Sequence, residues 1–107
     1  MRPVALALLL VGSLPAAAAP FEGTWAPTFP ACADPDAAVK LYAHRIERAG
    51  GSCGIGRLRT EGNAYDAVAW CRRGLAETPE RLRFEVLNGD LRITYPDRGD
   101  RERLVRC

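Results

Sequence analysis

The sequence predicts an all-β fold in the main: one small antiparallel meander or partial barrel, exported from the cell and held together by disulfides. The first observation is an N-terminal segment typical of a removable export signal. The second is the pair Asn88-Gly89 between two runs of alternating polar and apolar residues. The third is an even number of cysteines after the signal, at Cys32, Cys53, Cys71 and Cys107.

Residues 1–18 have the three parts of a secretory signal peptide: a charged start at Arg2, an apolar run from residue 3 to 14, and small residues before the cut. The apolar run is about a dozen residues long, too short for the roughly 20 that span a bilayer. We expect cleavage after Ala18 or Ala19, and Pro20 favours Ala18. Residues 19–107 then form a single domain that is periplasmic or secreted, with no cysteine near the cut to carry a lipid anchor.

Composition and size limit the function classes. The chain has 15 basic and 13 acidic residues, and Arg2 leaves with the signal, so the net charge of the exported part is near +1. Such a balance predicts no general attraction to nucleic acid or acidic lipid. A domain this small is marginally stable alone, and in an oxidising compartment four cysteines predict two disulfides.

The last third of the sequence predicts a hairpin. Residues 81–87 and 90–95 alternate, and Asn-Gly between them suits a type I′ turn, in which both residues adopt positive φ. In this register Val86 lies opposite Leu91 and Phe84 opposite Ile93, all on the apolar face. A second turn over 96–100 and a final strand over 101–107 follow.

Residues 53–60 and 64–71 predict a second hairpin around a turn at 61–63. With Gly62 at its centre, Cys53 lies opposite Cys71, and Trp70 lies across from Gly54, whose missing side chain leaves room for the indole. We therefore expect a Cys53–Cys71 bridge, which leaves Cys32 to pair with Cys107.

The segment from Asp34 to Gly51 is compatible with two structures. Asp34 as a cap, Pro35 in the first turn, Gly50 after the last turn and apolar residues at helical spacing indicate a short helix around 35–49. The run 39–46 is also compatible with a strand. The residues alone leave both alternatives open.

The order of these features resembles small secreted four-cysteine proteins of proteobacteria, which have no assigned activity. Gly23-Thr24-Trp25 at the start and Leu104 to Cys107 at the end belong to this resemblance, which covers nearly all of the exported part. It implies that the segment before Cys53 is extended, with at most a short helical turn at 35–38. The Gly-x-Trp opening also resembles the first strand of lipocalin-like barrels and of bacterial protease-inhibitor barrels.

Residues suited to catalysis or metal binding are few. The cysteines lack the close spacing of zinc ligands and of redox pairs. His44 is the single histidine, and Ser52 lies in a glycine-rich turn. Paired acids such as Asp97 and Asp100 lie in turns, where they cap or form Asx-turns. We expect no catalytic residue, no metal and no cofactor; a small hydrolase or metal-dependent enzyme using His44 is the alternative.

Arginines alternate along three runs, 57–59, 81–83 and 101–103, and form a basic stripe if these strands are neighbours. The simpler interpretation is a solvated face interrupted by Glu80, Glu85 and Glu102. The aromatic residues are expected mainly in the core, with Phe29 as the exception. These aromatic residues are Trp25, Phe29, Trp70, Phe84 and Tyr95.

The function predicted on these grounds is that of a non-enzymatic binding protein. An inhibitor of a protease or lysozyme is a concrete subtype. A structural envelope component is a further alternative. Recognition by a rigid scaffold is usually placed on loops. The candidate contacts with an unknown protein or small ligand are therefore Phe29, Arg72, Arg73 and Arg98. We expect a monomer that binds no nucleic acid and has no stable membrane anchor.

Overall fold

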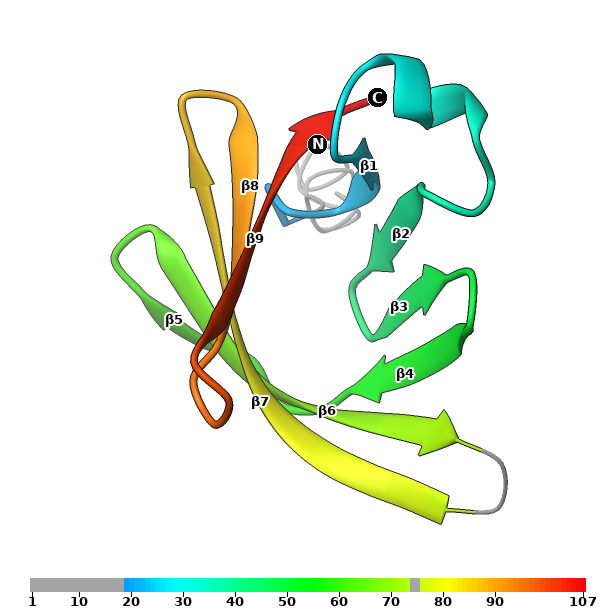
Figure 1. The fold of residues 1–107 in the computed structure, drawn as a ribbon. Coiled ribbons are helices and arrows are strands. Elements are labelled where there is room, and N and C mark those ends of the chain that lie inside the picture. The colour runs from blue at the N-terminus through cyan, green and yellow to red at the C-terminus, as the bar shows by residue number, and fades with distance from the viewer. Residues whose placement is uncertain (1–18, 74–75) are drawn as a thin grey trace, which may run out of the picture.

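The computed structural model describes residues 19–73 and 76–107 and shows an antiparallel β-barrel with two disulfides (Figure 1). A short 3-10 helix, η2 (Pro30–Ala33), follows the first strand. The strands are β1 (Gly23–Ala26), β2 (Val39–Tyr42), β3 (Arg45–Arg48), β4 (Gly51–Ile55), β5 (Arg59–Glu61), β6 (Ala64–Arg73), β7 (Ala76–Leu87), β8 (Asp90–Tyr95) and β9 (Asp100–Arg106).

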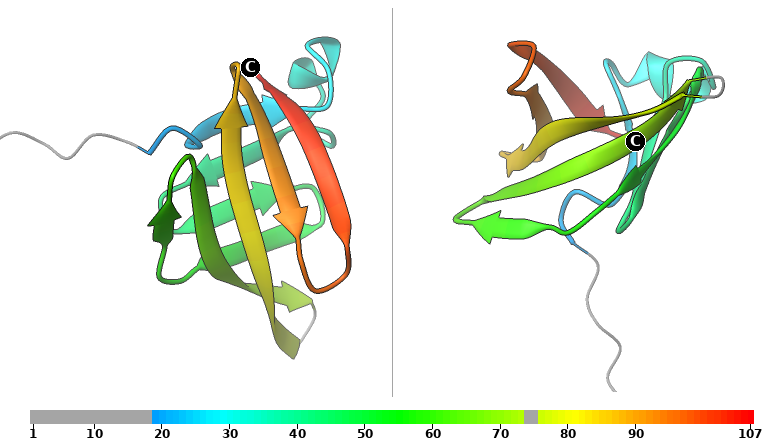
Figure 2. Two further views of the ribbon diagram at one scale, coloured as in Figure 1. Left: turned by 90° about the vertical axis from the view of Figure 1, so that its left-hand side faces the viewer. Right: turned by 90° about the horizontal axis from the view of Figure 1, so that it is seen from below.

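Two pairings close the sheet. The strand order is β4-β3-β2-β1-β9-β8-β7-β6-β5, so β1 lies between β2 and β9, and an additional pairing joins β4 to β6. The long strands β6 and β7 curve around one side, whereas β1 to β4 are short and cover the other (Figures 1 and 2). The predicted all-β antiparallel fold is therefore confirmed, and the sheet closes fully where the sequence predicts a meander or partial barrel.

The hairpin of β7 and β8 is as predicted. Val86 pairs with Leu91 and Phe84 with Ile93, and Asn88 and Gly89 have φ of 54° and 84°. The turn before β9 also lies where the sequence places it, although β9 begins one residue earlier, at Asp100.

The predicted register of the middle hairpin is confirmed at its base and wrong at its tip. Cys53 pairs with Cys71, and Gly54 with Trp70. Nearer the turn, however, Glu61 pairs with Ala64, so the turn has two residues rather than three. The extra residue lies between β4 and β5, where the chain leaves the regular ladder, as at a β-bulge.

The helix alternative for 35–49 is wrong, and the extended structure implied by the resemblance is correct. Residues 39–55 form β2, β3 and β4, which pair in sequence. Asp34 does act as a cap, but of a turn: its Oδ1 accepts a 2.9 Å hydrogen bond from the backbone N–H of Asp36. Pairing across the barrel outweighs the helical spacing because it buries Val39, Leu41 and Ile46 on a single face.

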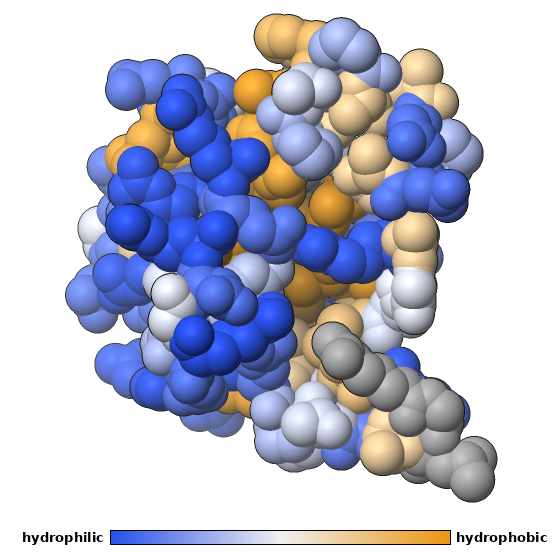
Figure 3. All heavy atoms as spheres, in the orientation of Figure 1, coloured by the Kyte–Doolittle hydropathy of each residue, from blue (hydrophilic) through white to orange (hydrophobic). Residues whose placement is uncertain are grey.

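Large apolar side chains fill the barrel. Seen along the barrel, apolar atoms lie at the centre, and hydrophilic atoms cover the side of β7 to β9 (Figure 3). The indole Nε1 of Trp25 donates a 2.8 Å hydrogen bond to the carbonyl of Phe21, and the Phe21 ring stacks on Phe84. The largest fully buried side chains are Trp25, Phe21, Phe84, Leu41, Leu91 and Ile93.

Both predicted disulfides are present. Cys53–Cys71 joins β4 to β6 inside the additional pairing that closes the barrel. Cys32–Cys107 joins η2 to the residue after β9. Among the described residues, no helix has the length and apolar character needed to cross a bilayer.

Candidate functional site

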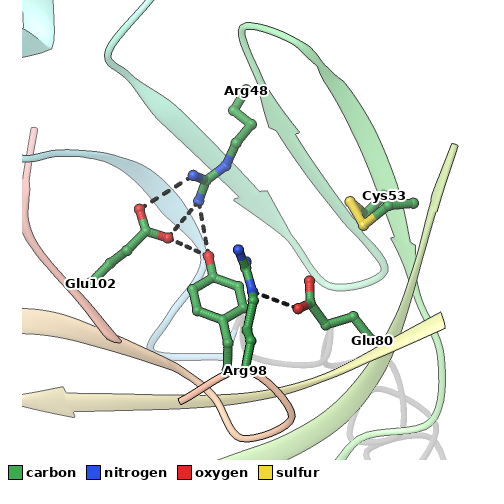
Figure 4. The surroundings of a disulfide bond; sticks show 7 residues. Arg48, Cys53, Glu80, Arg98 and Glu102 are labelled. Carbon is green, nitrogen blue, oxygen red and sulfur yellow. Dashed lines mark hydrogen bonds and ion pairs between the residues drawn. A yellow bond between two sulfur atoms is a disulfide. The ribbon is translucent and has the colours of Figure 1, made fainter. Parts of the chain in front are cut away.

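One end of the barrel interior carries charged side chains instead of apolar ones. At this end, here called the mouth, β3 and β8 end and β9 begins. Alternation with buried neighbours directs these side chains inward: Glu102 is two residues from buried Leu104, and Glu80 two from buried Leu82. The mouth cluster consists of Arg48, Glu80, Tyr95, Arg98 and Glu102. Figure 4 labels all of them except Tyr95.

An ion pair crosses the mouth. The two terminal nitrogens of Arg48 donate to the two carboxylate oxygens of Glu102, at 3.2 and 3.0 Å. Strands β3 and β9 are separated by β2 and β1 in the sheet, so this contact spans the opening. The Tyr95 hydroxyl also donates to Glu102, and Arg48 lies 3.4 Å from the hydroxyl oxygen.

A second pair completes the cluster. The Arg98 guanidinium lies 4.1 Å from the centre of the Tyr95 ring and 2.7 Å from a carboxylate oxygen of Glu80. Burial opposes the charge of Glu102, but hydrogen bonds from Arg48 and Tyr95 outweigh it and lower the pKa of that carboxyl. Burial and the bond to Glu102 raise the pKa of Tyr95, which therefore stays a hydrogen-bond donor. The two arginines and two glutamates therefore compensate one another's charges at this end of the barrel.

Inward-facing Glu80 and Glu102 correct the prediction of an acid-interrupted outer face. Of the three glutamates expected there, Glu85 alone shares the outer side with the arginines, and it pairs across strands with Arg92. One row runs from Arg59 on β5 through Asp66, Arg83 and Thr94 to Arg101 on β9. The strands of the predicted basic stripe are therefore not direct neighbours, because β6 and β8 lie between them. Acids other than those expected also divide the stripe: Glu61, Asp66, Asp90 and Asp97 each pair with one of its arginines.

A hollow of about 500 Å³ lies in this outer surface, between β5, β6, β7 and the β8–β9 turn. We call it the arginine hollow, because Arg57, Arg59, Arg81 and Arg83 line it. Asp66 is the one acid in its lining, which also includes Val68 and Pro96. A hydrogen bond from Arg83 lowers the pKa of Asp66, so this carboxyl is ionised at neutral pH.

Beside the hollow, β6 exposes apolar side chains. Val68 and Trp70 are 38% and 47% exposed. Trp70 was expected in the core, but its side chain lies on the outer face. Adjacent residues of a strand point to opposite faces, and its neighbour Ala69 is buried. The indole does not use the space at Gly54: nothing lies within 4 Å of where a Cβ would be at that position.

Five residues, one from each of five paired strands, form a single row across the outer surface, here called the Trp70 row. The cross-strand partners are Pro79, Trp70, Gly54, Arg45 and Tyr42, from β7 to β2. The Arg45 guanidinium lies 4.6 Å from the centre of the Tyr42 ring. Gly54 has no side chain and leaves an open position in the row, here called the notch. The Trp70 indole lies on one side of the notch, and Arg45 on the Tyr42 ring lies on the other.

The predicted contact residues lie in three places. Phe29 is 71% exposed and directly precedes η2. Figures 1 and 2 show η2 far from the C-terminal end of β6. Arg72 lies on β6 two residues after Trp70 and pairs with Glu77 at 3.4 Å, and Arg73 is the last residue of β6. Arg98 belongs to the mouth cluster. The fold thus brings Arg72 near Trp70 but does not bring all four together.

The residues weighed for catalysis are also apart in the sheet. His44 is exposed in the β2–β3 turn, and its carbonyl accepts a hydrogen bond from the Ile55 N–H. Ser52 faces outward on β4, opposite Glu47 on β3. No group of three or more His, Cys, Asp or Glu side chains in residues 19–73 and 76–107 is arranged to hold a metal ion.

Sequence reasoning missed the mouth cluster and the outward position of Trp70. Counting alternate positions back from Phe84 reaches Glu80, and back from Leu104 reaches Glu102, so the inward direction of both acids was readable. Arg48 could not be found in this way, because its partner Glu102 lies on β9, which β2 and β1 separate from β3 in the sheet.

Comparisons with protein-family models, with curated protein sequences and with solved structures gave no match for this chain.

Proposed function

We propose that this protein is a small exported binding protein without enzymatic activity, and that its ligand binds outside the barrel, around Trp70. The observation that carries this proposal is the exposed indole on the rigid outer face of β6. Large exposed aromatic side chains dominate the energetics of many binding sites, because they bury much area at low cost in conformational entropy.

The packing of the barrel supports an external site. Trp25, Phe84 and Leu91 occupy the interior with no exposed surface, and the mouth cluster covers one end. A ligand inside would have to displace these side chains. By contrast, the Trp70 row is open, and the notch at Gly54 can admit a flat group between the indole and Arg45.

Rigidity also supports recognition at this position. The Trp70 pairing with Gly54 lies directly beside the Cys53–Cys71 disulfide, so the strands that carry the row are covalently joined. A site on joined strands loses little conformational entropy when it binds, which favours affinity.

The experiment is affinity capture with oxidised protein immobilised and exposed to envelope extract and culture fluid. Bound proteins and small molecules are identified by mass spectrometry. Wild-type protein, Trp70→Ala and Phe29→Ala are compared, since Phe29 is an exposed aromatic residue outside the Trp70 row. We expect a species that wild type and Phe29→Ala retain and that Trp70→Ala loses. Near-ultraviolet circular dichroism checks that each variant is folded.

Loss with Phe29→Ala and retention with Trp70→Ala would refute the proposed site and place recognition on the loop beside η2. A His44→Ala variant tests the enzymatic alternative. We expect unchanged binding in this variant, and loss of a hydrolytic activity through this substitution would contradict a non-enzymatic function.

A further inference from the structure

We propose that the arginine hollow is a binding site for a phosphate group, on a ligand whose remaining part lies against Val68 and Trp70. This inference rests on the proposed function and deepens it by naming the chemistry of the ligand. Three observations support it: how the hollow forms, which of its arginines already pair with carboxylates, and the apolar surface beside it.

The hollow arises where the β4–β5 edge leaves its partner. The Gly56 N–H still donates to the carbonyl of Val68 at 2.8 Å, and regular pairing with β6 resumes at Arg59. Between them Leu58 packs against the core, which directs Arg57 and Arg59 to the outer side. Bulged segments of this kind commonly re-aim side chains at functional sites.

Two of the four arginines are held by carboxylates. Arg81 donates from Nε and Nη2 to Asp97 Oδ1, at 2.9 and 2.7 Å. Arg83 donates to both carboxylate oxygens of Asp66, at 2.8 and 3.0 Å. These contacts fix the two guanidinium groups at the wall of the hollow, and each retains further N–H donors.

The other two arginines have no such partner. In residues 19–73 and 76–107, neither Arg57 nor Arg59 makes an ion pair, and both line the hollow. Planar guanidinium groups bind phosphate oxygens through paired N–H donors. A phosphate monoester carries a charge of about −1.5 to −2 at neutral pH. This charge can balance the positive charges of both unpaired arginines, whereas a ligand with a single carboxylate would balance one of them.

The surroundings favour a ligand with an apolar or ring-bearing part next to its phosphate. Val68 belongs to the lining of the hollow, and Trp70 lies two positions further along the same face of β6. A ring stacked on the indole therefore lies next to a phosphate in the hollow. A sugar phosphate and the headgroup of a phospholipid share this chemistry.

The test uses inorganic pyrophosphate, titrated into isotope-labelled, oxidised protein in a buffer without phosphate. The measured signals are the Trp70 indole N–H and the arginine Nε–H resonances. The double variant Arg57→Gln/Arg59→Gln is compared with Arg92→Gln/Arg101→Gln. The second pair removes the same charge from exposed arginines of the same outer surface, outside the hollow.

We expect saturable shifts in wild-type protein, an affinity at least about tenfold weaker in Arg57→Gln/Arg59→Gln, and a change under about twofold in the control pair. Equal weakening in both double variants would overturn the proposal, because it would indicate diffuse attraction to the basic surface. Absence of binding in wild type would overturn it as well, even where capture through Trp70 succeeds, and so distinguishes this failure from failure of the proposed function.

Co-sedimentation with vesicles separates the two sources of phosphate. Vesicles of phosphatidylcholine alone are compared with vesicles that also contain phosphatidic acid. Binding to the second kind that Arg57→Gln/Arg59→Gln abolishes identifies a lipid headgroup as the ligand. Pyrophosphate binding without vesicle binding identifies a soluble phosphate ester, and both outcomes support the phosphate site.

Discussion

Replacing Glu102 by glutamine tests whether the mouth cluster stabilises the barrel. The substitution keeps the size of the side chain and removes its charge. In the native protein this carboxylate, with 30% of its side chain exposed, accepts hydrogen bonds from both terminal nitrogens of Arg48 and from the Tyr95 hydroxyl. Glutamine leaves Arg48 without its counter-charge and can accept only some of these hydrogen bonds.

The magnitude follows from the kinds of bond that are lost. Hydrogen bonds to charged groups contribute about 1.5–3 kcal/mol, against about 0.5–1.5 kcal/mol for neutral ones. Arg48 is 40% exposed and regains water on its free side, which reduces the loss. We therefore expect Glu102→Gln to lower the free energy of unfolding by about 1–2 kcal/mol, or the melting temperature by about 4–16 °C.

The assay is denaturant unfolding of wild type, Glu102→Gln and the matched control Glu77→Gln across a range of pH. Glu77 is 50% exposed and contacts Arg72 at 3.4 Å, so its variant should change stability by less than about 0.5 kcal/mol. The pKa of Glu102 lies below its ordinary value of 4.5, so its contribution is present above that pH and is lost as the pH falls further. Equal stability of the two variants at neutral pH, or a difference that grows in acid, would refute the reasoning.

Three further predictions concern the backbone and the disulfides. Cys107→Ser removes the disulfide to Cys32, whose two cysteines are 75 residues apart in the sequence. It should lower the free energy of unfolding by about 4–5 kcal/mol on the chain-entropy model, measured by denaturant unfolding against oxidised wild type, and an unchanged stability would contradict that model. Gly23 has φ of 134°, and an added Cβ would meet the Arg106 guanidinium at 2.8 Å, so Gly23→Ala should cost about 1–3 kcal/mol; a neutral result would show that this conformation is not required. Gly54→Ala has open space and should change thermal stability by less than about 0.5 kcal/mol while weakening capture through the Trp70 row; a large loss of stability would mean that the notch is structural.

Local patterns in the sequence predicted the parts of the fold that depend on neighbours in the chain. Asn88-Gly89 and the alternation around it are sufficient to set the β7–β8 register, because the turn geometry and the apolar face agree. The Cys53–Cys71 bridge followed from the same logic at the base of the second hairpin. Its tip was misjudged because one residue is absorbed between β4 and β5. Gly56 lies in that segment, and glycine within a strand often marks a bulge, but this sign was not used.

Features that depend on barrel closure could not be read in this way. Residues 39–48 have helical spacing of apolar positions, and only pairing with β1 and β4 makes strands the better solution. For the candidate site too, the local pattern was visible in the sequence, but the arrangement that depends on the closed barrel was not. The alternating arginines were visible in the sequence, whereas the arginine hollow exists because β5 separates from β4 and the β8–β9 turn lies against β7.

The position of β1 in the sheet has a consequence for how the chain folds. One neighbour of β1 is β2, next in sequence, but the other is β9, at the opposite end of the described chain. Until β9 is available, β1 keeps an unpaired edge of the kind that promotes association between chains. Contacts between distant segments also slow folding. We therefore expect the docking of β9 on β1 to be a late step of folding, and a factor that shields the β1 edge to act before it.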